Sequence, residues 1–304
     1  MKVLITGGTG FVGRSISRGL SEAGIPHRLL SRRGRGLGGL SEGYAGSVLD
    51  RGSLDRAMAG CDRVIHLVGI ISEAPGQTYE GVHTEGARRV LEAARAAGVR
   101  RWVHMSALGT RPDAVARYHR SKWEAEQAVR ASGLDWTVFR PSVIYGKGDG
   151  FVNLFARIGR WSPVVPVVGG GHSRLQPVDV ESVARCFVRA TVESLGIGET
   201  FDVCGPVPLT LREILDAIDR AMGRRRLRLV VPRSVAWGQA RFLEWLFPSV
   251  FRQAPPLNRD QILMLDEDNV GDPLPARRVF GIREESFADG LGRMFEGNGI
   301  KRSS

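Results

Sequence analysis

The sequence predicts an α/β fold, a doubly wound parallel sheet followed by a smaller C-terminal region. The chain opens on an apolar run at residues 2–6, and a glycine-rich turn and a helical pattern follow it directly. Short apolar runs then alternate with helical patterns as far as about residue 140, which is typical of parallel sheets covered by helices. A chain of 304 residues is long enough for one such sheet with added elements.

Each element is predicted from its own hydrophobic pattern and from the residues that interrupt it. Strands are expected at residues 2–6, 27–31, 44–48, 63–67, 101–105 and 136–139, and helices at 11–23, 53–59, 79–97 and 118–131. After Gly146 prolines and a Gly169-Gly170-Gly171 run interrupt the pattern, and helices are expected again at 180–193 and 211–222. We expect residues 1–160 to form the core and residues 161–304 to complete the sheet and form a lid.

Composition is ordinary for a soluble globular protein, with 42% hydrophobic and 25% charged residues. Three widely spaced cysteines without a C-x-x-C pair indicate neither a disulfide framework nor a metal site. The apolar residues Val3-Leu4-Ile5 follow directly on Met1-Lys2, so we expect no leader peptide, and no run reaches the roughly 18 apolar residues of a membrane span. A cytoplasmic protein is therefore expected, with peripheral attachment to the inner face of the membrane as a further option.

The glycine turn has the spacing of a dinucleotide-binding loop of the Rossmann type. Gly7 permits the tight turn, Gly10 lets the backbone approach a pyrophosphate, and Gly13 lets the helix pack closely on the strand. The pyrophosphate would lie on the helix N-terminus, whose free N–H groups favour an anion. The predicted contacts of this loop are Gly7, Thr9, Gly10, Phe11, Val12 and Gly13.

The end of the second predicted strand selects between the two nicotinamide dinucleotides. Sites that select NAD usually place an acid there to bind the ribose 2′-hydroxyl, whereas this chain has Ser31-Arg32-Arg33. An arginine can pair with a 2′-phosphate through two N–H bonds. NADP(H) is therefore favoured, and NAD(H) remains the alternative if both arginines are only solvated loop charges.

Five segments together resemble the extended and atypical short-chain dehydrogenases/reductases: residues 6–13, 64–69, Ser106, 118–122 and 140–146. Within that superfamily the segments 66–70, 103–107 and 175–180 are most similar to the group of the nucleotide-binding accessory subunit of respiratory complex I and its bacterial relatives. The resemblance covers roughly residues 1–205.

Tyr118 and Lys122 are four residues apart and so share one face of a predicted helix. A phenol can act as acid or base near neutrality if an adjacent ammonium stabilises its phenolate. Lys122 would supply that charge, and the resemblance implies that it also binds the nicotinamide ribose. Ser106, at the end of the preceding strand, would donate a hydrogen bond to the substrate oxygen.

The resemblance implies further cofactor contacts. Leu67, Val68 and Gly69 would pass beside the ribose and adenine, and Pro141, Val143 and Ile144 would line the nicotinamide pocket. Ser47 and Val48 occupy the position where many members carry an acid that contacts adenine. His83 replaces the asparagine of the family's proton relay, where it could either shuttle protons or pack passively. Gln176 and Asp179 could contact substrate or serve only the fold.

Most of the positive charge is concentrated near the C-terminus. Residues 220–259 contain nine arginines and one acid, Glu244, so this segment has a net charge of +8 out of +11 for the chain. Interleaved Trp and Phe within residues 224–252 suit a membrane surface or a protein partner such as a respiratory complex. A lid whose aromatic residues form its core is the other interpretation, and nucleic-acid binding is disfavoured because no recognition motif accompanies the arginines.

Two functions are compatible with these residues. The first is an NAD(P)-dependent oxidoreductase or epimerase in which Ser106, Tyr118 and Lys122 are the catalytic residues. The second is a cofactor-binding accessory protein of a respiratory complex I type assembly with little or no turnover. The short segment between Ser106 and Tyr118 argues against a sugar-nucleotide substrate, and no residue names another substrate.

Overall fold

The computed structural model describes the backbone of residues 1–296 and their side chains except those of 158–160 and 296. Its central sheet has seven strands, all parallel, in the order β11-β6-β5-β4-β1-β2-β3. They are β1 (Val3–Thr6), β2 (His27–Ser31), β3 (Ser41–Ala45), β4 (Arg63–His66), β5 (Arg101–Met105), β6 (Asp135–Pro141) and β11 (Glu199–Val203). The winding reverses between β1 and β4, and ligands of such sheets bind in the crevice at the carboxyl ends of these strands.

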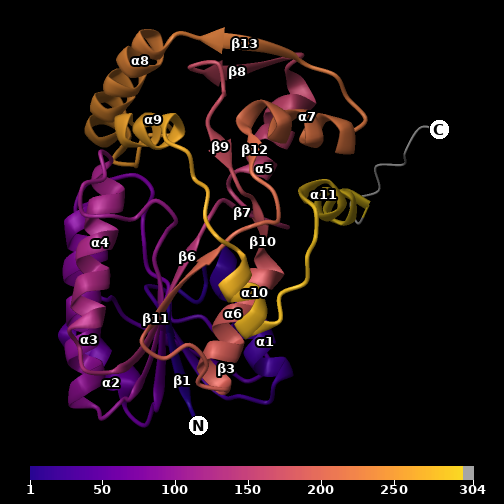
Figure 1. Ribbon diagram of the computed structural model, residues 1–304. Helices are drawn as coiled ribbons and strands as arrows, with labels where there is room; N and C mark the ends of the chain where they lie inside the picture. Colours follow the sequence, from indigo (N-terminus) through magenta and orange to yellow (C-terminus); the bar gives the residue numbers. More distant parts are fainter. Residues whose placement is uncertain (297–304) are drawn as a thin grey trace.

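Helices cover both faces of the sheet (Figure 1). One face carries α2 (Arg51–Met58), α3 (Gly86–Ala96) and α4 (Arg117–Arg130), and a π-helical segment, η1 (Glu80–Glu85), leads into α3. The other carries α1 (Phe11–Glu22), α6 (Val180–Val192) and α10 (Leu274–Phe280). Because side chains alternate along a strand, Leu4 packs into the core beneath the first layer, and Val3 and Ile5 pack into the second.

The C-terminal region lies beyond the carboxyl end of the sheet, at the top of Figure 1. Its own core is formed with α5 (Val152–Trp161), α7 (Leu211–Ala221), α11 (Phe287–Glu296) and β8 (Val164–Val168), which pairs in parallel with β13 (Leu227–Val231). The remaining elements are α8 (Arg233–Leu246), η2 (Phe247–Phe251), α9 (Arg259–Asp266) and the short strands β7 (Ile144–Tyr145), β9 (Arg174–Leu175), β10 (Val178–Asp179) and β12 (Leu209–Thr210).

The predicted doubly wound sheet is confirmed, and most element boundaries agree within two residues. The predicted bounds of the third strand were wrong, because β3 spans Ser41–Ala45 instead of 44–48. This edge strand buries none of its residues, so the sequence there lacks the apolar run that marks the other strands. The three cysteines are free and buried. Among the described residues no helix is both long and apolar enough to cross a bilayer.

Candidate cofactor and active site

The glycine turn between β1 and α1 brings the backbone close to any bound dinucleotide. Gly7 has a φ of +76°, which side chains disfavour, and its carbonyl accepts a hydrogen bond of 3.0 Å from Gly10 N–H. A Cβ atom on Gly13 would lie 2.6 Å from the Gly7 carbonyl oxygen and from the Gly8 backbone. Helix α1 begins at Phe11 without a side-chain cap, so its first N–H groups remain available for a phosphate.

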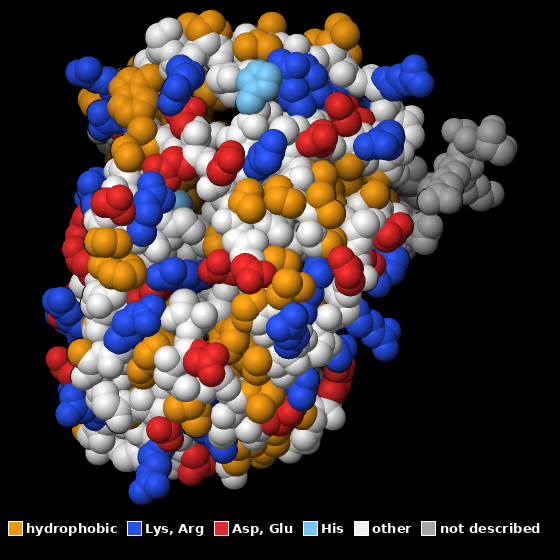
Figure 2. All heavy atoms as spheres, viewed as in Figure 1, with side chains coloured by type: hydrophobic (Ala, Val, Ile, Leu, Met, Phe, Trp, Pro, Cys, Tyr) orange, Lys and Arg blue, Asp and Glu red, His pale blue; other side chains and the backbone are white. Residues whose placement is uncertain are grey.

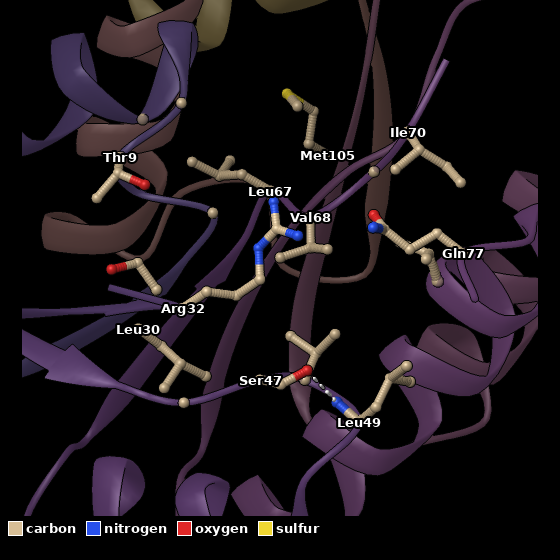
Figure 3. A pocket seen from close by; sticks show the side chains of 18 of the residues that line it. Thr9, Leu30, Arg32, Ser47, Leu49, Leu67, Val68, Ile70, Gln77 and Met105 are labelled. Carbon is tan, nitrogen blue, oxygen red and sulfur yellow. Dashed lines mark hydrogen bonds between the residues drawn. The ribbon is translucent and has the colours of Figure 1, made fainter. Parts of the chain in front are cut away.

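A cavity of about 620 Å³ opens beside this turn, at the carboxyl ends of β1, β2 and β4. Figure 3 shows Thr9 on one side of it and Leu67 and Val68 behind, with Ser47 and Leu49 opposite. Of the predicted cofactor contacts, the structure brings these together around the cavity: Gly7, Thr9, Gly10, Phe11, Val12, Gly13, Ser31, Arg32, Ser47, Val48, Leu67, Val68 and Gly69.

The end of the cavity next to β2 is lined by a serine and an arginine. Arg32 is exposed, lines the cavity, and forms no ion pair within the part of the chain that the structure describes. Its guanidinium points toward Leu67 and Val68 in Figure 3. Ser31 also lines the cavity, and its buried hydroxyl has no hydrogen-bond partner among the described residues. No aspartate or glutamate is among the described residues that line the cavity.

Some predicted cofactor contacts lie outside the cavity, and some residues that line the cavity were not predicted from the sequence. Arg33 is exposed and does not line the cavity. The other predicted contacts outside its described lining are Tyr118, Lys122, Pro141, Val143 and Ile144; Pro141 ends β6 and Ile144 begins β7. Leu30, Leu49 and Met105 do line it, and each adjoins a residue that the sequence did single out. Gln77 reaches the cavity from the loop after β4 (Figure 3), and no sequence signal marks it.

Helix α4 brings Lys122 to the end of β5, next to Ser106, and none of Ser106, Tyr118 and Lys122 is among the described lining residues of the first cavity. The Lys122 ammonium donates a hydrogen bond of 3.1 Å to the Met105 carbonyl, immediately before Ser106. A Cβ atom on Gly69 would lie 2.9 Å from Lys122 Nζ, so the ammonium also lies against the loop after β4. Ser106 and Lys122 are each 3% exposed, and Ser106 Oγ donates to Thr110 Oγ1 at 3.3 Å.

Burial controls the protonation of this site. It raises the pKa of Tyr118 to about 12, since removing the phenolate from water is unfavourable. The Tyr118 ring is surrounded by other rings, with those of His83, Tyr79 and His119 edge-on to it at 5.2 to 5.9 Å. Burial also lowers the pKa of Lys122 to about 8, and Glu126 partly offsets that shift. The tyrosine is therefore protonated at neutral pH and the lysine remains mainly charged.

His83 connects α4 to the loop after β4. Its Nε2 accepts a hydrogen bond from Ile70 N–H at 3.0 Å, so the ring proton is on Nδ1 and faces Ser121 Oγ at 2.8 Å. Ser121 Oγ in turn donates to the Tyr118 carbonyl. Burial, with a smaller contribution from Lys122, lowers the pKa of His83 to about 2. Both ring nitrogens are occupied in a neutral imidazole, which fits a positioning residue better than a proton shuttle.

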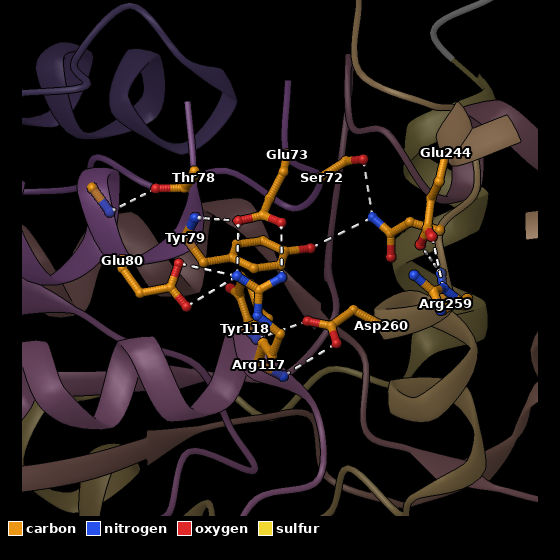
Figure 4. Close-up of polar contacts among 12 residues, drawn as sticks. Ser72, Glu73, Thr78, Tyr79, Glu80, Arg117, Tyr118, Glu244, Arg259 and Asp260 are labelled. Atoms are coloured by element: carbon orange, nitrogen blue, oxygen red, sulfur yellow. Dashed lines mark hydrogen bonds and ion pairs between the residues drawn. The ribbon is translucent and has the colours of Figure 1, made fainter. Parts of the chain in front are cut away.

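The N-terminus of α4 is fixed by the C-terminal region. Asp260 in α9 accepts hydrogen bonds from Arg117 N–H at 3.1 Å and Tyr118 N–H at 2.8 Å (Figure 4). Arg117 also pairs with Glu73 and Glu80. A second cavity, of about 700 Å³, lies between these residues and α8, and its described lining includes Tyr79, Trp237, Pro248 and Arg259.

Gln176 and Asp179 serve the fold. The Gln176 side chain donates to the Gly205 carbonyl and accepts from Gly271 N–H. The Asp179 carboxylate caps α6 through Ser182 N–H at 2.8 Å. Among the described residues no three His, Cys, Asp or Glu side chains are close enough together to hold a metal ion.

Comparison with known proteins agrees with this geometry. The model of a family described as NAD(P)H-binding matches residues 7–157, which include the glycine turn, Ser106, Tyr118 and Lys122. A ceramide reductase of Caulobacter vibrioides is 37% identical over 66% of this chain, and a sterol demethylase protein B of Methylococcus capsulatus is 30% identical over 96% of this chain and 97% of its own length. The chain belongs to the short-chain dehydrogenase/reductase superfamily.

The superfamily relatives also include subunit 9 of the NADH dehydrogenase 1 alpha subcomplex of Mus musculus, 32% identical over 66% of this chain. The chain spans 64% of the ceramide reductase and 56% of the mouse subunit. Among solved structures, the UDP-glucose 4-epimerase of Thermotoga maritima, with UDP-glucose, covers 97% of this chain and 98% of its own, with a TM-score of 0.75 and 19% identity. At 19% identity this similarity establishes a shared fold, and it gives no information about the substrate.

Proposed function

We propose that this protein is an NADP(H)-dependent oxidoreductase that reduces a carbonyl substrate with Ser106, Tyr118 and Lys122. The observation that carries the proposal is the hydrogen bond from the Lys122 ammonium to the Met105 carbonyl. It joins the helix that bears Tyr118 to the strand end that bears Ser106, beside the cavity that Met105 and Gly69 line.

Each side chain has a role in that reaction. The nicotinamide, when bound, supplies the hydride that adds to the carbonyl carbon. The Ser106 hydroxyl donates a hydrogen bond to the substrate oxygen and polarises it. Tyr118, protonated at neutral pH because its pKa is about 12, gives its proton to that oxygen as the C=O double bond is reduced. Lys122 then stabilises the phenolate that remains, and the reverse steps oxidise the alcohol.

The preference for NADP(H) is supported by Arg32 and by the lack of a carboxylate among the described lining residues. A 2′-phosphate at the end of β2 would pair with the Arg32 guanidinium and accept a hydrogen bond from the Ser31 hydroxyl, which otherwise has no partner in the described chain. The ribose of NAD(H) would leave Arg32 unpaired there.

The substrate that we propose is a ketone of a membrane lipid. Two of the relatives are named for lipid substrates, the ceramide reductase and the sterol demethylase protein B, and the second of these is aligned over nearly the whole of both chains. The segment from Ser106 to Tyr118 is too short for the loop that sugar-nucleotide epimerases place there. Long-chain keto-sphingolipids and keto-sterols are therefore the first substrates to assay.

Substitution of Tyr118 tests this function. We expect Tyr118→Phe to reduce NADPH oxidation with an active keto-lipid by at least about a hundredfold, because the proton donor is lost. The affinity for NADPH, measured by fluorescence titration, should change little. A Tyr79→Phe variant is the matched control, because this neighbouring phenol donates to the Ile71 carbonyl and is given no catalytic role. Unchanged turnover in Tyr118→Phe would contradict the proposal.

The second candidate is a cofactor-binding accessory protein of a complex I type assembly. Similarity to NADH dehydrogenase subunits of mouse and rat, and to the 40 kDa subunit of Neurospora crassa, favours it. The histidine at the relay position also favours it, because both of its nitrogens are already bonded. If the protein has this function, we expect it to retain NADPH through purification and to co-purify with the respiratory complex. Tyr118→Phe should change neither property.

A further inference from the structure

Helix α8 has two apolar faces, although only one of them contacts the fold. Ala236 and Ala240, one turn apart, are fully buried and pack with Ile262 of α9. Val235, Phe242 and Trp245 lie on roughly the opposite side of the helix, because at 100° per residue these three positions fall within an arc of about 80°. Their side chains are 57%, 55% and 63% exposed. The aromatic residues of this segment therefore do not form the core of a lid, as one interpretation of the sequence expected.

The apolar surface continues onto the neighbouring elements. In β13, which pairs with β8 and leads directly into α8, Leu227 and Leu229 are exposed. Figure 2 shows hydrophobic side chains along the top edge of the molecule, where Figure 1 places β13 and α8, interleaved with Lys and Arg. We define the α8 surface as these exposed residues of β13, α8 and η2: Leu227, Leu229, Val235, Phe242, Trp245, Val250 and Phe251.

Seven of the nine arginines of residues 220–259 fall into two groups. Arg226, Arg228, Arg233 and Arg259 pair with acids, mostly from outside the segment that carries the +8 charge: Asp216, Asp219, Glu244 and Asp266. Arg225, Arg241 and Arg252 are exposed and form no ion pair with any residue that the structure describes. Arg241 and Arg252 adjoin Phe242 and Phe251 in the chain, and Arg225 lies two residues before β13, so these cations flank the exposed apolar residues.

We propose that the α8 surface binds the surface of an anionic lipid bilayer. A helix lying flat on a bilayer requires an apolar face that enters the interfacial region and cations that reach the lipid headgroups. The α8 surface supplies the first, and Arg225, Arg241 and Arg252 supply the second. Trp and Phe are suited to that depth, since their rings are apolar and stiff. Ala236 and Ala240 hold the opposite face of α8 on the protein, so the outward face can enter the bilayer without unfolding the helix.

Vesicle co-sedimentation tests the proposal on the full chain, without any substrate. We expect binding to vesicles of equal parts phosphatidylcholine and phosphatidylglycerol, much weaker binding to phosphatidylcholine alone, and loss of binding as salt is raised. The double variant Phe242→Ser/Trp245→Ser should bind about tenfold less tightly, because two exposed aromatic side chains no longer enter the bilayer. Ile197→Ser is the matched control, an exposed apolar residue beside the amino end of β11.

A charge variant separates the two contributions. Arg225→Glu/Arg241→Glu should abolish the difference between anionic and neutral vesicles while the protein remains folded, as circular dichroism would verify. Equal binding of the wild type to both vesicles, or no binding to either, would overturn the proposal. So would self-association in analytical ultracentrifugation that Phe242→Ser/Trp245→Ser abolishes, since a second copy would then cover the surface. None of these outcomes depends on the proposed reductase activity.

Discussion

Arg32 and Gly13 determine different properties of the cofactor site. Gly13 controls whether a dinucleotide can be bound, because a side chain there would meet the backbone of Gly7 and Gly8, which cannot move without opening the turn. We propose that Arg32 selects which dinucleotide is bound, because it is the only arginine among the described lining residues of the cavity. The sequence predicted both residues, but it could not separate Arg32 from Arg33.

Separate substitution of the two arginines gives a residue-scale prediction. We expect Arg32→Ala to weaken NADPH binding about tenfold to a hundredfold, the loss of a charged hydrogen bond, with little effect on NADH. Arg33→Ala is the matched control and should change neither affinity much, because its side chain does not line the cavity. Calorimetric titration with both cofactors measures this. A wild-type preference for NADH would refute the NADP(H) assignment.

At the scale of elements, α4 is positioned by partners far away in sequence. Its N-cap residue, Ala116, has no side chain that can cap the helix, and Asp260 of α9 accepts from the first N–H groups instead. His83 and Lys122 fix the helix against β4 and β5. The sequence predicted the helix and the shared face of Tyr118 and Lys122, but a cap supplied from 142 residues away leaves no local pattern.

Removal of this cap is the element-scale prediction. We expect Asp260→Ala to lower the free energy of unfolding by about 1 kcal/mol, because two N–H groups of α4 lose their acceptor. Asp260→Asn should retain most of that stability, since an amide oxygen also accepts these bonds. Urea unfolding followed by circular dichroism gives the comparison. If the alanine and asparagine variants are equally stable, the carboxylate does not act as the cap.

At the scale of the whole molecule, five of the six histidines lie in the interior of the fold. His27, His66, His83, His104 and His119 are each 1% to 3% exposed, and burial lowers the pKa of every one of them. It lowers that of His66 to about 3 and that of His119 to about 4. The folded protein therefore keeps these rings neutral at pH values where the unfolded chain would protonate them.

Acid sensitivity follows from this linkage. The stability due to the neutral rings is complete above the unfolded pKa of about 6.5 and is lost as the pH falls toward the folded values. Between pH 7 and pH 5.5, before most carboxylates titrate, we expect the free energy of unfolding to fall as the pH falls. The slope should correspond to several more protons bound by the unfolded chain than by the folded protein. His104→Leu should reduce that slope by about one proton, whereas His172→Gln, at the exposed histidine, should not. A slope near zero in the wild type would contradict the prediction.

The sequence by itself determined the doubly wound sheet, the glycine turn, and most of the residues between Gly7 and Gly69 that line the cavity. These follow from local rules, because strand and helix periods and turn glycines act within a few residues and parallel strands bring their carboxyl ends to one edge. Only the tertiary structure showed that both ring nitrogens of His83 are hydrogen-bonded and that Gln176 and Asp179 make contacts within the fold. It also showed that Asp260 caps α4 and that Phe242 and Trp245 face outward. The contacts of His83, Gln176 and Asp260 join residues that are distant in sequence and close only after folding. The outward position of Phe242 and Trp245 follows from which face of α8 packs on the rest of the described chain.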